Sequence, residues 1–389
     1  MTKPITLLLF LLAGIDLANA QNADQVVIGT KHIIYSGILD EDRAYWVGLP
    51  ESYHEETSSY KRYPLLIVLD GHAHFRSVSG IVNYMSSGYN GNRRIPEMIV
   101  VAIQNVNRNR DFTPDKIITK RENDFGGGDK FLSFLEEELI KRLDQEYRTI
   151  PYRILYGHSL GGLLATHAYM KENTLFNSFI AVDPSMGAWD AETMDKKIEA
   201  VTDRSFDRFI YIASANWGKR NIRNRDRHVR LYESLNSSCE GTFPGQLEYF
   251  ENENHGSVPA IAFHNGIAAI FKGYGVSYRD IESKEQLILH FQSLSQRLSW
   301  DFDPPEALVN RIGYRMLGSR NKDAVAKAID FFLLNTENYP SSFNAFDSLG
   351  EAYETLGDKE KAIENYKRSL ELNPGNEHAK AKMESLNQE

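Results

Sequence analysis

Eight short stretches of the chain are rich in β-branched, aromatic and other apolar residues, and more polar segments separate them. Several are unbroken apolar runs, such as Leu65–Leu69 and Ile99–Ile103. Unbroken runs are typical of strands that are buried on both faces, as in a parallel sheet. The predicted strands are Val26–Ile34, Tyr45–Leu49, Leu65–Asp70, Met98–Ile103, Arg153–Tyr156, Phe179–Val182, Arg208–Ala213 and Leu247–Phe250.

Amphipathic helical patterns lie between these strands. The clearest is 130–147, where Leu135, Leu139 and Leu143 follow each other at a spacing of four residues. Alternating strands and helices predict an α/β fold with a mostly parallel open sheet. A functional site is then expected where the strands end, at the carboxyl edge of the sheet.

Beyond about residue 275 the strand-like runs stop and the pattern becomes purely helical. The segment 343–374 resembles a tetratricopeptide repeat, and a weaker copy with a displaced first helix precedes it. We therefore predict a catalytic domain at 21–275, a helical linker at 276–306 and a small all-helical domain at 307–389. Two repeats are too few to stand alone, so we expect them to pack on the catalytic domain or on a second copy of the chain.

One hexapeptide, Gly157–Gly162, carries the strongest chemical signal. Its G-x-S-x-G pattern follows a predicted strand and opens a helical stretch, which is the context of the nucleophile elbow of α/β-hydrolases. The glycines leave room for a sharp turn that exposes the serine hydroxyl. We predict that Ser159 is a nucleophile, with His158 as flanking structure; the alternative is a glycine-rich turn with an incidental serine.

A serine hydrolase of this fold needs an acid and then a histidine after the serine. His255 lies on a loop after the last predicted strand, so it is the predicted general base; a histidine without function on a surface loop is the alternative. Asp226 has the right chain order for the acid. Asp183 is the second candidate and Glu253 the third, and a Ser–His pair without a carboxylate also remains open.

Two backbone N–H groups must stabilise the oxyanion of the intermediate. We expect them at Leu160, directly after the serine, and at His72, in the loop after the third strand. A metal site built from His72 and His74 is the rival interpretation, but no further ligand stands nearby at a suitable spacing. The sequence therefore predicts catalysis without a metal or cofactor.

The net charge of −9 over 389 residues gives no indication of nucleic-acid binding. Locally, however, Arg108 and Arg110 follow one predicted strand, and several further basic residues lie between Lys219 and Arg230. Both clusters could line the site and bind an anionic substrate. Equally, they could pair with the carboxylates of their own loops.

The N-terminus has the pattern of a secretory signal peptide: Lys3, then the apolar run Leu7–Ile15, then an Ala18–Ala20 cleavage site. The run is too short for a membrane anchor, and no other segment is apolar enough to span a bilayer. We expect an exported protein, in a bacterial periplasm or outside the cell. Cys239 is the only cysteine, so no intramolecular disulfide can form.

Several motifs together resemble the putative-esterase family of α/β-hydrolases, which includes esterase D-like enzymes and siderophore esterases. They are 49–53, 68–71, 110–114, 157–162 and 255–259. The resemblance implies Ser159 as nucleophile, His255 as base and the Arg110 region facing the substrate. The expected function is hydrolysis of carboxylic esters through an acyl-serine intermediate, with siderophore trilactones favoured as substrates. A general short-acyl carboxylesterase, or an inert fold that binds partners through its repeats, is the alternative.

Overall fold

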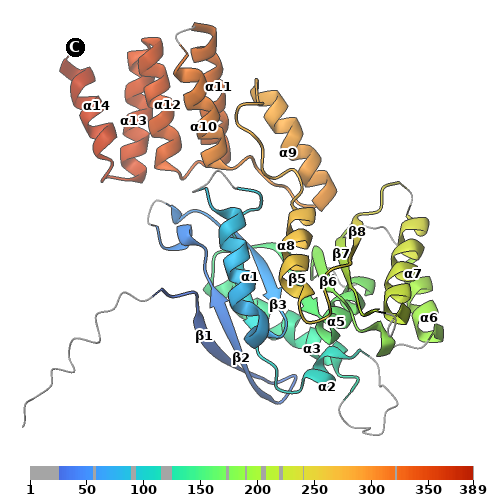
Figure 1. Cartoon of the computed structure of the whole chain (residues 1–389). Coiled ribbons are helices and arrows are strands. Elements are labelled where there is room, and N and C mark those ends of the chain that lie inside the picture. Colours follow the sequence, from blue (N-terminus) through green and yellow to red (C-terminus); the bar gives the residue numbers. More distant parts are fainter. Residues whose placement is uncertain are drawn as a thin grey trace, which may run out of the picture.

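The computed structural model places a single eight-stranded sheet in the first two thirds of the chain (Figure 1). It describes residues 26–388 except 56–57, 89–92, 115–124, 172–174, 189–190, 203–206, 219–221, 240 and 320–321. The strand order is β1-β2-β4-β3-β5-β6-β7-β8. The strands are β1 (Thr30–Ser36), β2 (Glu41–Gly48), β3 (Tyr63–Val68), β4 (Ile99–Ile103), β5 (Thr149–His158), β6 (Ser178–Val182), β7 (Phe209–Ala215) and β8 (Gly245–Phe250).

Each predicted strand overlaps one of these eight, and the α/β-hydrolase fold class is confirmed. Strands β3 to β8 pair in parallel, whereas β1 and β2 add an antiparallel edge. The apolar runs are unbroken because both faces of the central strands are buried. In β3, Leu66 and Val68 belong to the core on one face, and Leu65 and Ile67 to the core on the other.

Helices cover both faces of the sheet (Figure 1). One face packs on α1 and α8, and the other on the helical stretch 128–146, α5 and α7. The predicted helix 130–147 is thus present, as α3, a short π-helical turn and α4 in succession. The helices of this part are α1 (Gly71–Ser86), α2 (Arg108–Phe112), α3 (Gly128–Phe134), α4 (Ile140–Glu146), α5 (Leu160–Met170), α6 (Ala191–Thr202), α7 (Ile222–Ser238) and α8 (Val258–Ile270).

The remaining helices form an extended stack beside the sheet domain (Figure 1). They are α9 (Lys284–Leu298), α10 (Glu306–Leu317), α11 (Lys322–Asn338), α12 (Phe343–Leu356), α13 (Lys359–Leu372) and α14 (Glu377–Gln388). Helices α10 and α11 form one antiparallel pair, and α12 and α13 form the next. The all-helical C-terminal region predicted from the sequence is therefore confirmed.

Glycines explain why the first repeat looks displaced in the sequence. A Cβ at Gly350 would lie 2.9 Å from the ring of Tyr366, and one at Gly313 would lie 2.6 Å from the ring of Phe332. The two glycines thus have the same role, because each allows an aromatic ring of the paired helix to approach closely. The two glycines are 37 positions apart and the two rings 34, so the first repeat has three additional residues between its glycine and its ring.

The helical stack is joined to the sheet domain by a shared apolar core. One core cluster runs from β3 and β5 through α8 and α9 into α10, α11 and α12. At the junction Tyr152 of β5 packs edge-on against Phe302, with ring centroids 5.3 Å apart. Tyr60 also donates a hydrogen bond to Glu306 at the start of α10. The repeats thus pack on the sheet domain, as expected, while the predicted boundaries at 275 and 306 stay predictions.

The predicted signal peptide, with its cleavage site before Gln21, lies outside the described residues. In the part of the chain that is described, we find no helix with both the length and the apolar character needed to cross a membrane.

Candidate active site

Ser159 lies in a sharp turn between β5 and α5. Its backbone has φ 60° and ψ −118°, a conformation that is strained for a residue with a side chain. The turn is possible because Gly157 and Gly162 lack Cβ atoms. A Cβ at Gly157 would lie 2.1 Å from the carbonyl oxygen of Gly161, and one at Gly162 would lie 2.9 Å from that of Val182. This is the backbone geometry of a nucleophile elbow.

His255 lies between β8 and α8, and its side chain reaches the turn that follows β6. Its Nδ1 donates a hydrogen bond to Oδ2 of Asp183, at 2.6 Å. Asp226, the acid favoured from the sequence, lies instead on an exposed position of α7. The geometry therefore replaces Asp226 with Asp183, the second candidate, as the carboxylate behind His255. Ser159, Asp183 and His255 follow one another in the chain order of an α/β-hydrolase.

The surroundings of Asp183 favour its ionised form. Its side chain is only 1% exposed, and burial alone would raise its pKa. The hydrogen bond from His255, the nearby His228, the Ala215 N–H and the Trp217 indole N–H outweigh this effect and hold the pKa below its usual value. An ionised carboxylate fixes the tautomer of His255, which leaves Nε2 free to accept a proton.

The hydroxyl of Ser159 shares a hydrogen bond with the hydroxyl of Ser185, with 3.0 Å between the oxygens. The backbone N–H of Ser185 also donates to the carbonyl of Ser159, again at 3.0 Å. Among the described contacts, none joins Ser159 Oγ to His255. Contacts between nucleophile and base are often loose without substrate and tighten when it binds. Ser185 therefore holds the hydroxyl in its resting position.

The two predicted oxyanion donors begin neighbouring helices at the same edge of the sheet. Leu160 is the first residue of α5, and His72 is the second of α1, so neither N–H has a partner within its helix. Strands β3 and β5, which lead into these helices, are paired in parallel. A Cβ at Gly161 would lie 3.4 Å from Oδ2 of Asp70, so the two helix starts are close together.

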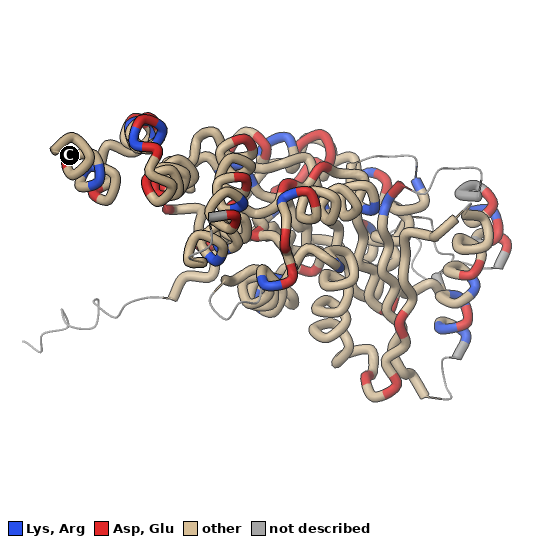
Figure 2. Tube along the Cα trace, turned by 90° about the horizontal axis from the view of Figure 1, so that it is seen from above, with Lys and Arg blue, Asp and Glu red and all other residues tan. Residues whose placement is uncertain are grey.

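The arginines expected to bind substrate are paired with carboxylates of the protein. Arg108 forms a two-pronged ion pair with buried Asp70, at 2.6 and 3.0 Å, and also donates to the carbonyl of His158. Arg110 pairs with Glu41 and Asp111. In Figure 2, basic and acidic residues are likewise interspersed along the chain. About one third of each arginine side chain is exposed, and their ion pairs link the loop after β4 to carboxylates of β2, α2 and the end of β3.

The family of the sheet domain follows from its similarity to known proteins. The family model described as "Putative esterase" matches residues 36–229, and a tetratricopeptide-repeat model matches 348–376. The sheet domain belongs to the putative-esterase family. A ferri-bacillibactin esterase of Bacillus subtilis is 25% identical over 216 residues, which cover 50% of this chain and 74% of the relative.

Solved structures agree with this assignment. An IroE-like serine hydrolase from Shewanella oneidensis superposes with a TM-score of 0.70 at 25% identity, over 80% of this chain and 99% of its own. A siderophore hydrolase from Aspergillus nidulans, at 20% identity and a TM-score of 0.52, shares the fold; the match covers 63% of this chain and 96% of its own. The chain is thus an ester hydrolase by family.

Two residues of the candidate active site, Ser185 and Trp217, were not predicted from the sequence. Ser185 stands two positions after Asp183, directly beyond β6, and Trp217 two positions beyond the end of β7. Their position just past strand ends was the available signal. Their contacts with Ser159 and Asp183 depend on how the strands are ordered in the sheet, which the sequence pattern does not specify.

The rival metal site does not form around His72 and His74. His74 is largely buried, with its ring edge-on to the rings of Tyr156 and His158, while His72 is exposed. Across the described ranges, no group of three or more His, Cys, Asp or Glu side chains is arranged to hold a metal ion.

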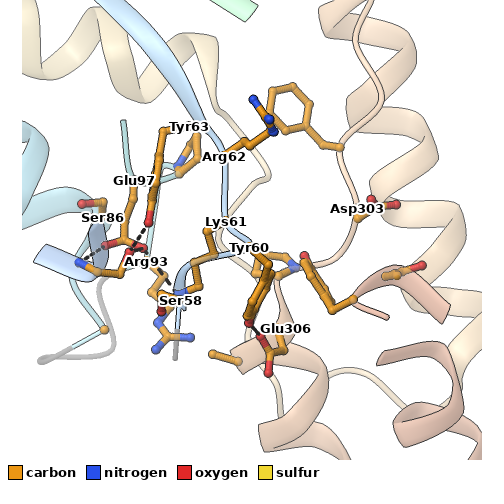
Figure 3. Close-up of a pocket in the computed structure, with 18 of the residues that line it drawn as sticks. Ser58, Tyr60, Lys61, Arg62, Tyr63, Ser86, Arg93, Glu97, Asp303 and Glu306 are labelled. Carbon is orange, nitrogen blue, oxygen red and sulfur yellow. Dashed lines mark hydrogen bonds and ion pairs between the residues drawn. The ribbon is translucent and has the colours of Figure 1, made fainter. Parts of the chain in front are cut away.

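A cavity of about 1190 Å³ lies between the esterase domain and the helical stack (Figure 3). Its walls include Lys61, Arg62 and Glu97 from one side and Asp303, Glu306 and Tyr339 from the other. Ile150, near the start of β5, also lines it, whereas Ser159 follows the end of the same strand. The cavity is therefore at the opposite edge of the sheet from the candidate active site.

Proposed function

We propose that this esterase is an exported serine hydrolase that cleaves carboxylic esters through an acyl-serine intermediate. The observation that carries the proposal is the convergence of the Ser159 elbow with the His255–Asp183 hydrogen bond at one edge of the sheet. An elbow serine backed by a histidine and a buried carboxylate matches the Ser-His-Asp arrangement.

In the proposed reaction the Ser159 hydroxyl turns from Ser185 toward His255 as the ester binds. Oγ attacks the ester carbonyl while Nε2 of His255 takes its proton. The oxyanion of the tetrahedral intermediate receives hydrogen bonds from the Leu160 and His72 amides. When the C–O bond breaks, His255 returns the proton to the alcohol, and water then hydrolyses the acyl-serine by the same steps.

Siderophore esters, such as enterobactin-like trilactones, are the proposed natural substrates. The relatives named above support this choice, since one is described as a ferri-bacillibactin esterase and one as a siderophore hydrolase. A relative described as a siderophore triacetylfusarinine C esterase, from Aspergillus fumigatus, is 38% identical over 64 residues, 16% of this chain and 22% of its own. We further propose that the helical repeats bind a protein partner or a second copy of the chain.

The first experiment compares wild type with Ser159→Ala on p-nitrophenyl acetate. We expect the substitution to lower kcat by at least about 10³-fold, with an unchanged melting temperature. Equal rates would refute the serine mechanism. The second experiment compares kcat/KM for enterobactin with kcat/KM for p-nitrophenyl acetate in the wild type. A preference for the simple ester would instead identify a general carboxylesterase.

The proposed anion contact is tested with Arg110→Gln. If Arg110 contacts substrate, KM should rise for a ferric, negatively charged siderophore and stay unchanged for the neutral acetate ester. A change that is equal for both substrates would assign Arg110 to the ion-pair network alone.

Export is tested by expressing the full chain in a bacterium and sequencing the N-terminus of the periplasmic protein, which should begin at Gln21. Full-length protein confined to the cytoplasm would refute export.

A further inference from the structure

The imidazole of His255 packs against two other rings. The indole of Trp217 has its centroid 4.5 Å away, tilted by 40°, and the imidazole of His158 has its centroid 4.4 Å away, tilted by 39°. These rings come from different strands, since Trp217 follows β7 and His158 ends β5. His255 is therefore held by two ring contacts in addition to its hydrogen bond with Asp183.

Trp217 is connected to the same carboxylate oxygen as His255. Its Nε1 donates to Oδ2 of Asp183 at 2.6 Å, the distance at which His255 Nδ1 approaches the same atom. One oxygen thus accepts two N–H groups, and the position of Asp183 depends on both. Loss of the indole N–H would leave His255 as the single donor to that oxygen.

The loop around Trp217 is attached to the loop that carries His255. Asn216 donates its backbone N–H to the carbonyl of Glu253 at 2.8 Å and its side-chain amide to the carbonyl of Glu251 at 2.7 Å. Gly218, at φ +63°, then turns the chain back, and its N–H donates to Oδ1 of Asn216. These bonds hold the indole against the imidazole, although 40% of Trp217 is exposed.

The charges around His255 suit a ring that becomes positive during the reaction. Burial, followed by the neighbouring His255 and His74, lowers the pKa of His158 to about 4, so His158 is neutral near pH 7. Trp217 is uncharged and presents a π face, which attracts a cation. Asp183 supplies the negative charge. Glu251 and Glu253 flank His255 on its own loop, and His228, behind Asp183, is buried against the Pro184 carbonyl.

We propose that Trp217 is a positioning residue of the esterase, which holds Asp183 through its N–H and stabilises the His255 imidazolium through its ring. The inference rests on the proposed serine mechanism, because only there does His255 become an imidazolium. Trp217 acts through these two residues and needs no contact with the substrate. Substitutions at Trp217 should therefore change kcat and its pH dependence, while KM for a small ester stays constant.

The test compares Trp217→Phe, which keeps a ring but loses the N–H, with Trp217→Leu, which loses both. On p-nitrophenyl acetate we expect kcat to fall about tenfold for the Phe variant and by a further factor of about three to ten for the Leu variant, at constant KM. In the Phe variant the pKa of the acidic limb of kcat/KM should rise, since Asp183 then directs more of its charge to His255.

Trp300→Phe is the matched control, because it makes the same chemical change at the opposite edge of the sheet. It should leave kcat and the pH profile unchanged. If Trp217→Phe keeps the wild-type kcat and pH profile while Ser159→Ala is inactive, the role of Trp217 is refuted and the serine mechanism stands. If Trp217→Phe loses activity only through unfolding, with an unchanged pH profile, the role is again refuted. If Ser159→Ala stays active, the proposed function itself fails.

Discussion

Replacement of Asp183 by Asn is the most informative perturbation of the site, because the two residues have nearly the same shape. In the wild type one carboxylate oxygen accepts from His255 and Trp217, and the other accepts from the Ala215 N–H. An amide has only one acceptor oxygen. If that oxygen faces His255 and Trp217, the amide NH2 meets the Ala215 N–H; if it faces Ala215, the NH2 meets the two ring donors.

The expected loss follows from this geometry. Asp183 is buried, so water cannot replace the lost acceptor, and the amide also lacks the charge that stabilises the imidazolium. The corresponding change in serine proteases lowers kcat about 10⁴-fold, because the histidine then takes the wrong tautomer. Here we expect a loss of about 10² to 10⁴-fold in kcat, which corresponds to roughly 3 to 5 kcal/mol at the transition state.

The assay is steady-state hydrolysis of p-nitrophenyl acetate by wild type, Asp183→Asn and Asp226→Asn, with thermal melting of each protein. Asp226 is exposed on α7, so its variant should stay within about twofold of wild type. The reasoning is refuted if Asp183→Asn retains kcat within about threefold. If neither variant loses activity, the site works as a Ser–His pair.

Two further predictions concern stability. Gly350→Ala should lower the free energy of unfolding by about 1 to 3 kcal/mol, because its Cβ would press on the ring of Tyr366. Gly80→Ala has open space at its Cβ and should raise the free energy of unfolding by about 0.5 to 1 kcal/mol. Urea unfolding of both variants tests this, and equal effects would contradict the packing argument. Because the pKa of His158 is lowered in the native protein, its imidazole is protonated in the unfolded chain but not in the native chain between about pH 6.5 and pH 4. As the pH falls through this range, His158 therefore lowers the free energy of unfolding by up to about 3 kcal/mol. His158→Gln should accordingly lose less stability than wild type between pH 7 and pH 4.5, and an identical loss would contradict the assignment.

The strands could be predicted from the sequence because the apolar residues of each strand indicate that it is buried. A run such as Ile99–Ile103 is apolar at every position and rich in β-branched residues, which is typical of a strand covered on both faces. The elbow was predictable for a similar reason, since Gly157 and Gly162 are required by contacts within the turn and with the adjacent strand end. In both cases the local sequence contains most of the physical cause.

The acid and the arginines were harder to predict because their partners are remote in the sequence. Asp183 stands directly at a strand end, yet its preference over Asp226 depends on hydrogen bonds from His255 and Trp217. The same holds for Arg108, whose charge is evident in the sequence while its pairing with Asp70 is not. The position of a charged residue near a strand end therefore does not show whether its side chain binds substrate or forms an ion pair within the protein.

The position of the helical stack has a consequence for how the enzyme can be used. The stack adjoins the start of β5, and Ser159 follows its end; strand geometry puts about 30 Å between these points. A chain immobilised by its repeats would therefore hold the Ser159 turn away from the attachment. The attachment and the candidate active site are separated by the length of one strand. On a surface coated through the repeats, we therefore expect the candidate active site to stay open to diffusing esters.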